Sequence, residues 1–299
     1  IIYDTNDEII RRMLKKILRF IIAALLVLAP IQGVQILAKF APVTSQNLAT
    51  YIMACFAYAL VSGIILFFVL NKNLPKALLL GGILLFAGGA VAATAIALLE
   101  PDFSQTVLQN TARDHFRYLT LFLFAIITSY AFYIIMKHLW VELAYTHKWI
   151  APIFILAAIL FFWEFIHQYF YAENLKKWID TGKNATDFNS YYFDNFNTKT
   201  FGLGRVFQYL SIGWLGLILL RFERVKKWSW ALLAFLCTTG LLVGCRLIMV
   251  EAQVIFKGEA FPKGWEILNL FVLPAAPFLL LYWTSIALLT KTTKSERDR

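Results

Sequence analysis

Apolar residues occur along this chain in eight blocks of about twenty residues, and polar residues separate the blocks. The blocks lie near 17–38, 49–70, 77–99, 118–137, 149–170, 205–221, 228–249 and 266–290. A helix needs about 20 apolar residues to cross the hydrocarbon core of a bilayer. These runs are continuously apolar, whereas transmembrane strands alternate between polar and apolar residues. The pattern predicts an all-α, polytopic transmembrane helix bundle with about eight spans, forming one integral membrane domain over residues 1–299.

The composition supports this class of protein. Hydrophobic residues make up 60% of the chain and charged residues only 15%, against about 25% charged residues in a soluble domain. The three cysteines, Cys55, Cys237 and Cys245, all lie within apolar blocks, and their spacing fits neither a disulfide framework nor a zinc motif. The residues before the first block show no cleavage-site pattern, so we expect that block to be a retained anchor.

The net charge of +10 comes mainly from Lys and Arg residues that flank the apolar blocks. This placement predicts contacts with anionic lipids and no binding of nucleic acid. With the N-terminus inside, 17 of the 28 Lys and Arg residues fall in cytoplasmic segments. The positive-inside rule therefore predicts that both termini are cytoplasmic and that the protein is integral to the cell inner membrane.

Two spans carry signals of special packing. In block 77–99, Gly89, Ala93 and Ala97 form a stripe of small residues that lets a neighbouring helix approach closely, so we expect a central helix. In block 266–290, Pro274 and Pro277 should bend or locally unwind the helix, which frees backbone carbonyls that need new donors.

The segment 171–204 is predicted to be a long external loop. It mixes charged residues with many aromatic ones, and disordered chains are poor in aromatic residues. We therefore expect this loop to pack on the membrane surface, with a short interfacial helix over residues 173–179.

Ionisable residues inside apolar blocks indicate where function lies, because they are costly to keep in a membrane. Glu164 is the deepest, about 22 Å along its helix from Trp149. His167 follows on the same helix face, and Arg246 should reach a similar level from block 228–249. We predict an outward-facing, ligand-binding cluster; its members are Glu164, His167, Arg246, Glu251 and Arg205.

Other interpretations of this cluster stay open. One alternative is a purely structural cluster that ties helices together, and another is a metal site formed by His115, Glu164 and His167. A haem would need His115 with His167, or His138 with His147, and no cofactor is strongly implied. Cys245 beside Arg246 is a candidate thiolate nucleophile, with His167 as its base.

The chain contains no complete catalytic motif. We therefore expect a multi-pass inner-membrane protein that binds or transports a lipidic or small amphipathic molecule through an outward-facing polar cavity. The other role in the same class is a membrane subunit of a larger complex, with partners in that complex. The alternative class is a membrane-embedded enzyme or redox protein, with a haem or metal site at the external leaflet.

Overall fold

The computed structural model describes residues 13–14, 17–18, 21–28, 46–70, 74–98, 102–192, 198–251, 266–273 and 275–291. All regular secondary structure in these ranges is helical, and they contain no strand. The all-α prediction is confirmed for this part of the chain. The predicted first span lies outside the described residues except at 17–18 and 21–28, which are helical.

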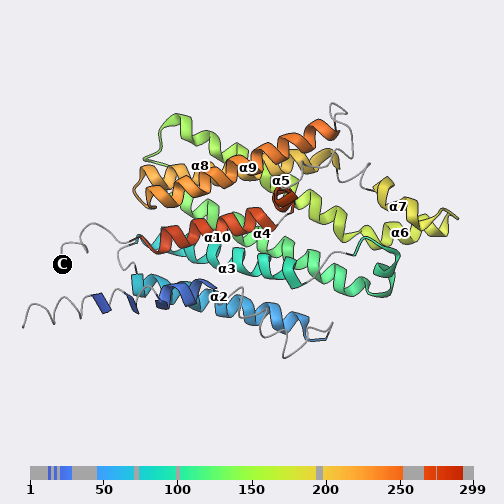
Figure 1. Cartoon of the computed structure of the whole chain (residues 1–299), viewed down its shortest axis with the longest axis horizontal. Helices are drawn as coiled ribbons and strands as arrows, with labels where there is room; N and C mark the ends of the chain where they lie inside the picture. The colour runs from blue at the N-terminus through green and yellow to red at the C-terminus, as the bar shows by residue number, and fades with distance from the viewer. Residues whose placement is uncertain are drawn as a thin grey trace, which may run out of the picture.

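The long helices lie side by side as a bundle (Figure 1). In the described ranges they are α2 (Leu48–Leu70), α3 (Lys76–Leu98), α4 (Thr111–Leu139), α5 (Ile150–Tyr169), α8 (Thr198–Arg221), α9 (Lys227–Glu251) and α10 (Ala275–Leu289). Short helices connect them: η1 (Gln105–Gln109), η2 (Tyr145–Trp149), α6 (Tyr171–Asp180), α7 (Ala185–Tyr192) and η4 (Glu266–Phe271).

Within the described ranges, 5 helices are long and apolar enough to cross a membrane, judged by length and composition. They are Leu48–Phe68, Thr111–Leu139, Tyr145–Tyr169, Phe201–Arg221 and Lys227–Val250. Two shorter apolar helical segments, Lys76–Ala92 and Ala275–Leu289, complete the described bundle. The described helices are therefore compatible with a transmembrane helix bundle.

Helix α3 lies at the centre of one half of the bundle, and glycines on two of its faces allow this. A Cβ atom at Gly81 would lie 2.5 Å from Ile135 Cγ1 of α4, and one at Gly88 would lie 2.8 Å from Thr128 Cγ2. On another face, a Cβ atom at Gly89 would lie 3.0 Å from the carbonyl oxygen of Phe278 in α10. The close approach predicted at Gly89 is confirmed. The side chains of Ala93 and Ala97 lie outside the described part.

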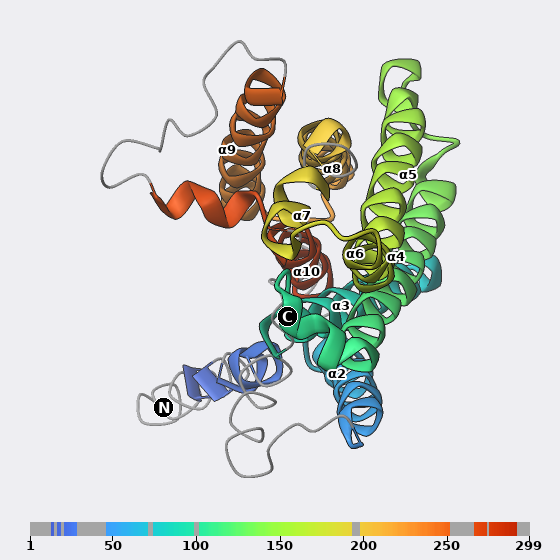
Figure 2. The ribbon, with the colours of Figure 1, turned by 90° about the vertical axis from the view of Figure 1, so that its right-hand side faces the viewer.

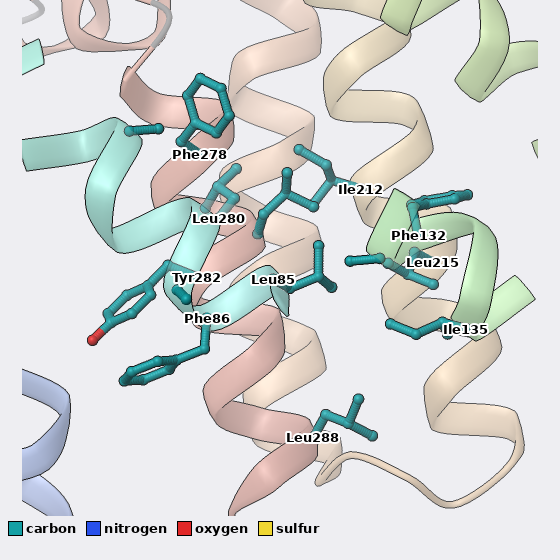
Figure 3. Packing of buried hydrophobic residues seen from close by; sticks show 14 of the residues in the cluster. Leu85, Phe86, Phe132, Ile135, Ile212, Leu215, Phe278, Leu280, Tyr282 and Leu288 are labelled. Atoms are coloured by element: carbon teal, nitrogen blue, oxygen red, sulfur yellow. The ribbon is translucent and has the colours of Figure 1, made fainter. Parts of the chain in front are cut away.

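The hydrophobic core runs between α3, α4, α8 and α10 (Figure 3). Leu85 and Ile135 are fully buried, as are Leu215 and Leu288. Helix α10 packs against α3, α8 and α9, so it fills the middle of the arrangement seen along the bundle (Figure 2). The order α3, α4, α5, α8, α9 then surrounds α10, with each helix packed against the next.

The helical run of the last predicted span is interrupted, as the prolines predict. Helix η4 ends at Phe271 and α10 begins at Ala275, with Pro277 in the first turn of α10. Proline is tolerated there because backbone amides in a first helical turn have no partner within the helix. Pro274 itself lies outside the described residues.

One end of the bundle is covered by three short helices, η1, α6 and α7, which we call the cap. A small hydrophobic cluster joins them, with Val107, Leu175 and Phe188 at its centre. Gly182, with a φ angle of 79° in the left-handed region that favours glycine, follows the end of α6 and turns the chain toward α7. The predicted helix 173–179 is confirmed as part of α6.

Two long helices begin earlier at the cap end than predicted. Helix α4 begins at Thr111 instead of near residue 118, and α8 begins at Thr198 instead of near 205. The predicted loop 171–204 is therefore largely helical, and residues 193–197 of it lie outside the described ranges. The additional turns of α4 are mostly polar, and they contain Asp114 and Arg117 of the candidate site.

Candidate functional site

A layer of buried polar side chains lies at the cap end of α4, α5 and α8. Each of these side chains is at least nine-tenths buried, although the surrounding helices are apolar. We call this set the polar layer; its members are Asp114, Arg117, Tyr118, Glu164, Gln168, Arg205 and Gln208.

Glu164 and Arg205 form a bidentate ion pair in this layer. Arg205 Nη1 donates to Glu164 Oε2 at 3.1 Å, and Arg205 Nη2 donates to Glu164 Oε1 at 3.0 Å. Arg205 is 0% exposed and Glu164 is 3% exposed. Parallel hydrogen bonds of this kind are the strongest geometry that a guanidinium and a carboxylate can adopt. The pair fixes α5 against α8.

Arg205 also binds the broken helix before α10. Its Nε atom donates to the carbonyl oxygen of Val272 at 2.7 Å, and its Nη1 atom donates to Gln208 Oε1 at 3.0 Å. Tyr209, one helical turn further along α8, donates its hydroxyl to the carbonyl oxygen of Phe271 at 2.7 Å. These are carbonyls freed by the interruption between η4 and α10, so α8 supplies the donors that the helix break requires.

The ring of Tyr209 is held in place by α9. A Cβ atom added at Gly240 would lie 2.5 Å from Tyr209 Cδ2, so only glycine leaves room for the ring. Nearby, a Cβ atom at Gly244 would lie 3.2 Å from the carbonyl oxygen of Gly202. The close packing of α8 on α9 therefore positions the hydroxyl that binds Phe271.

Several other polar atoms in this layer have no hydrogen-bond partner within the described residues. These atoms are Asp114 Oδ2, Arg117 Nε and Nη1, Tyr118 Oη and Gln208 Nε2. Asp114 and Arg117 are 6% and 4% exposed, and no ion pair joins them there. Groups of this kind are normally hydrogen-bonded when they are buried, so this part of the layer is incomplete without an additional polar partner.

The unpartnered groups and the ion pair belong to one electrostatic environment. Glu164 lies close enough to both Arg117 and Tyr118 for its charge to act on them. The carboxylate of Asp114 likewise interacts with Arg117. The layer thus contains two pairs of opposite charges. Glu164 and Arg205 are joined by hydrogen bonds, whereas Asp114 and Arg117 are not.

The structure corrects the predicted partners of Glu164. Its carboxylate binds Arg205 and, at 3.5 Å, the side-chain amide of Gln168, and it forms no ion pair with Arg246. His167 is half-buried, and its ring packs edge-on against Trp163 at 4.3 Å between centroids. Arg246 is half-buried on α9, and Glu251 ends that helix with a side chain outside the described part. Of the predicted cluster, the structure joins Glu164 and Arg205 directly.

The structure gives most of the predicted metal and haem ligands other contacts. His115 Nε2 lies 2.7 Å from Glu173 Oε1 of α6, and the His115 ring stacks on Tyr169. Among the described residues no three His, Cys, Asp or Glu side chains group as metal ligands would. The set of His115, Glu164 and His167 therefore does not form a ligand cluster. At the opposite end of the bundle, His147 Nδ1 accepts a hydrogen bond from Trp214 Nε1 at 2.9 Å, while His138 is exposed.

Cys245, the candidate nucleophile, is exposed on α9. Cys55 and Cys237 are buried. His167, its proposed base, lies on α5, and the structure records no contact between the two side chains within the described ranges. This arrangement gives no support to the thiolate interpretation.

Tyrosine hydroxyls make hydrogen bonds within the cap and between the cap and α5. Tyr171 donates to the carbonyl oxygen of Phe103 at 2.8 Å, and Tyr192 donates to the carbonyl oxygen of His167. Burial raises the pKa of Tyr171 to about 12, with the nearby charges of Asp102 and Asp114 acting in the same direction. The cap therefore contacts α5 and lies close to Asp114 of the polar layer.

The cluster predicted from the sequence does not include Asp114, Arg117 or Gln208. The predicted span 118–137 excludes Asp114 and Arg117, because a hydropathy window ends at charged residues. A helical stripe nevertheless identifies them, since Asp114, Arg117, Leu121 and Thr128 recur at helical spacing and are all buried. Extending this stripe toward the N-terminus would have revealed the polar face of α4.

The chain matches no protein-family model, no curated protein and no solved structure. Its own residues define the class: a bundle of apolar helices with a buried, partly unsatisfied polar layer beneath a helical cap.

Proposed function

We propose that this protein binds or transports a lipidic or small amphipathic molecule whose polar head enters the layer beneath the cap. The observation that carries the proposal is Arg117, a guanidinium that is 4% exposed and has two unpartnered nitrogen atoms. Burial of an unpaired charge costs several kcal/mol unless another group satisfies it. A bound ligand supplies that group.

The position of the layer favours an amphipathic ligand over a fully polar one. Glu164 lies near the cap end of α5, and apolar residues occupy most of the helix between it and the opposite end. Side chains such as Leu119, Leu123 and Ile126 on α4 are exposed in the isolated chain, as expected of a surface that faces lipid. A ligand with its head in the polar layer can therefore extend an apolar tail along the bundle.

The proposed location is the cell inner membrane. In the proposed topology the chain crosses this membrane about eight times, with both termini in the cytoplasm. The support for this topology is the charge at the end of the bundle opposite the cap, where Lys76, Lys137, Lys148, Arg221 and Lys227 lie at or beside helix ends. Positively charged residues favour the cytoplasmic side. In this orientation the cap and the polar layer face outward, and the basic end meets anionic lipids.

The test compares Arg117→Met with Arg113→Gln. Arg113 is in the first turns of the same helix but is only half-buried, so the control removes an equal charge without removing the unpartnered group. Native mass spectrometry would count lipids that stay bound to each purified variant. We expect wild type and Arg113→Gln to retain bound lipid and Arg117→Met to lose it while remaining folded, because burial of a charge whose hydrogen bonds are not all made costs stability.

Equal lipid retention in all three proteins would refute the proposed site. A membrane subunit of a larger complex would behave differently, because Arg117→Met would then lower the yield of the complex and leave lipid retention unchanged. An enzyme or redox protein would be recognised by an absorption spectrum and metal analysis of the purified wild type.

A further inference from the structure

Resting on the proposed function, we infer that the ligand head is zwitterionic and combines a phosphate with a primary ammonium group, as phosphoethanolamine does. The inference starts from the charges of the polar layer. Glu164 and Arg205 neutralise each other through two hydrogen bonds. Asp114 and Arg117 are left, with opposite charges, both buried and each without an ion pair in the described structure.

A ligand with a single charge would satisfy only half of this arrangement. An anion bound to Arg117 would leave Asp114 buried beside a second negative charge, and like charges held close together are costly. A cation bound to Asp114 would do the same to Arg117. A zwitterion places each of its charges against the opposite one, so the complete site is electrically neutral.

The unpartnered atoms also specify the chemistry of each charge. On the donor side, Arg117 Nε and Nη1, Tyr118 Oη and Gln208 Nε2 all lack an acceptor. A phosphate offers several acceptor oxygens, and a guanidinium matches its geometry with parallel hydrogen bonds. A phosphate therefore accommodates this group of donors better than a carboxylate, which has only two oxygens.

On the acceptor side, Asp114 Oδ2 lacks a donor. A primary ammonium group can donate to it, whereas the quaternary ammonium group of choline has no N–H to donate and is bound instead by aromatic rings. Asp114 and Arg117 are three residues apart on α4, which places their Cβ atoms about 5–6 Å apart on one helix face. The short linker of ethanolamine suits this separation.

The experiment measures binding to the full-length protein in detergent micelles doped with one lipid at a time. The lipids are phosphatidylethanolamine, phosphatidylglycerol, which has no ammonium group, and phosphatidylcholine, which has no N–H donor. We expect wild type to prefer phosphatidylethanolamine over both others by about tenfold or more. Soluble phosphoethanolamine is added as a competitor: displacement of the lipid identifies the head alone as the ligand, and no displacement identifies the lipid.

Asp114→Asn keeps the shape of the side chain and removes its charge. We expect this variant to lose the preference for phosphatidylethanolamine and to bind phosphatidylglycerol at least as well, because the repulsion of a second anion is gone. Asp114→Ser provides an independent variant if the amide perturbs folding, and Arg113→Gln again provides the control. Size-exclusion profiles establish that each variant is folded.

The outcomes separate this inference from the proposed function. If wild type binds phosphatidylglycerol as tightly as phosphatidylethanolamine and Arg117→Met loses both, the site exists but the zwitterion is wrong. An Asp114→Asn variant with an unchanged lipid preference also overturns the zwitterion. If Arg117→Met binds every lipid like wild type, both proposals fail.

Discussion

Replacing Arg205 with Met would test whether one side chain holds the cap end of the bundle together. Arg205 makes hydrogen bonds to both carboxylate oxygens of Glu164, to Gln208 and to the carbonyl oxygen of Val272. Methionine occupies a similar volume but makes none of these bonds. The substitution leaves Glu164, which is 3% exposed, as a buried charge without its cation.

Two estimates bracket the expected loss of stability. Removing one partner of a buried ion pair costs about 3–5 kcal/mol in soluble proteins. Hydrogen bonds between helices in a membrane average about 0.6 kcal/mol each, and the four made by Arg205 would therefore total about 2.4 kcal/mol. We expect Arg205→Met to lower the free energy of unfolding by about 2–5 kcal/mol. Glu164→Gln combined with Arg205→Met should recover part of this loss, because no buried charge then remains unpaired.

The assay is reversible unfolding in mixed micelles of wild type, both single variants and the double variant. Arg221→Met is the matched control, since Arg221 is exposed at the far end of the same helix, and its effect should stay within about 0.5 kcal/mol. We expect a coupling energy of at least about 1 kcal/mol between Glu164 and Arg205. If the single effects add to within about 0.5 kcal/mol, the ion pair does not join the two helices energetically and the reasoning is wrong.

Other parts of the structure give further predictions. Gly240→Ala should destabilise the protein by about 1–3 kcal/mol, because the new methyl group would overlap the ring of Tyr209. Gly204→Ala should be tolerated, because the nearest atom to a Cβ atom there is 3.5 Å away. Equal thermal stability of the two variants would contradict this prediction. For Tyr171, a folded-state pKa of about 12 lies above the ordinary value of 10.0, so its contribution to stability is complete below pH 10 and is lost as pH rises through 12. Tryptic cleavage monitors opening of the cap, and Tyr171→Phe should not show this loss of stability at alkaline pH. An identical loss of stability in both proteins would refute the role of Tyr171. A cysteine at Lys183 in the cap should react with a membrane-impermeant reagent on intact cells, and one at Glu223 in the turn between α8 and α9 should not; the reverse pattern would invert the proposed topology.

The sequence predicted the helical class, most helix positions and the break before α10, because these depend on local hydropathy and on proline. The partner of Glu164 could not be predicted in the same way. Depth along a helix follows from residue number, but the direction in which a side chain points depends on which helices pack together. Since α8 packs against both α5 and α9, it separates Arg246 from Glu164 and places Arg205 beside Glu164 instead.

The start of α4 shows a second physical limit. Hydropathy assigns a cost to every charged residue, so the predicted span begins only at residue 118. Asp114 and Arg117 are nevertheless buried in the helix, because neighbouring helices and the cap cover them. Burial of this kind is produced by tertiary structure and does not appear in the hydropathy of a single segment.

The several bonds of Arg205 have a consequence for how the protein is made. During synthesis Glu164 enters the membrane with α5 before Arg205 follows with α8, and a lone charge in an inserting helix costs free energy, up to about 2.5–3.5 kcal/mol at the helix centre. A carboxylate already in place lowers that cost for α8. The carbonyl oxygen of Val272 is synthesised later still, so the site at the cap end closes only when the last helix arrives. A chain that ends before Val272 would therefore insert its earlier helices, and Arg205 would lack one of its hydrogen-bond acceptors.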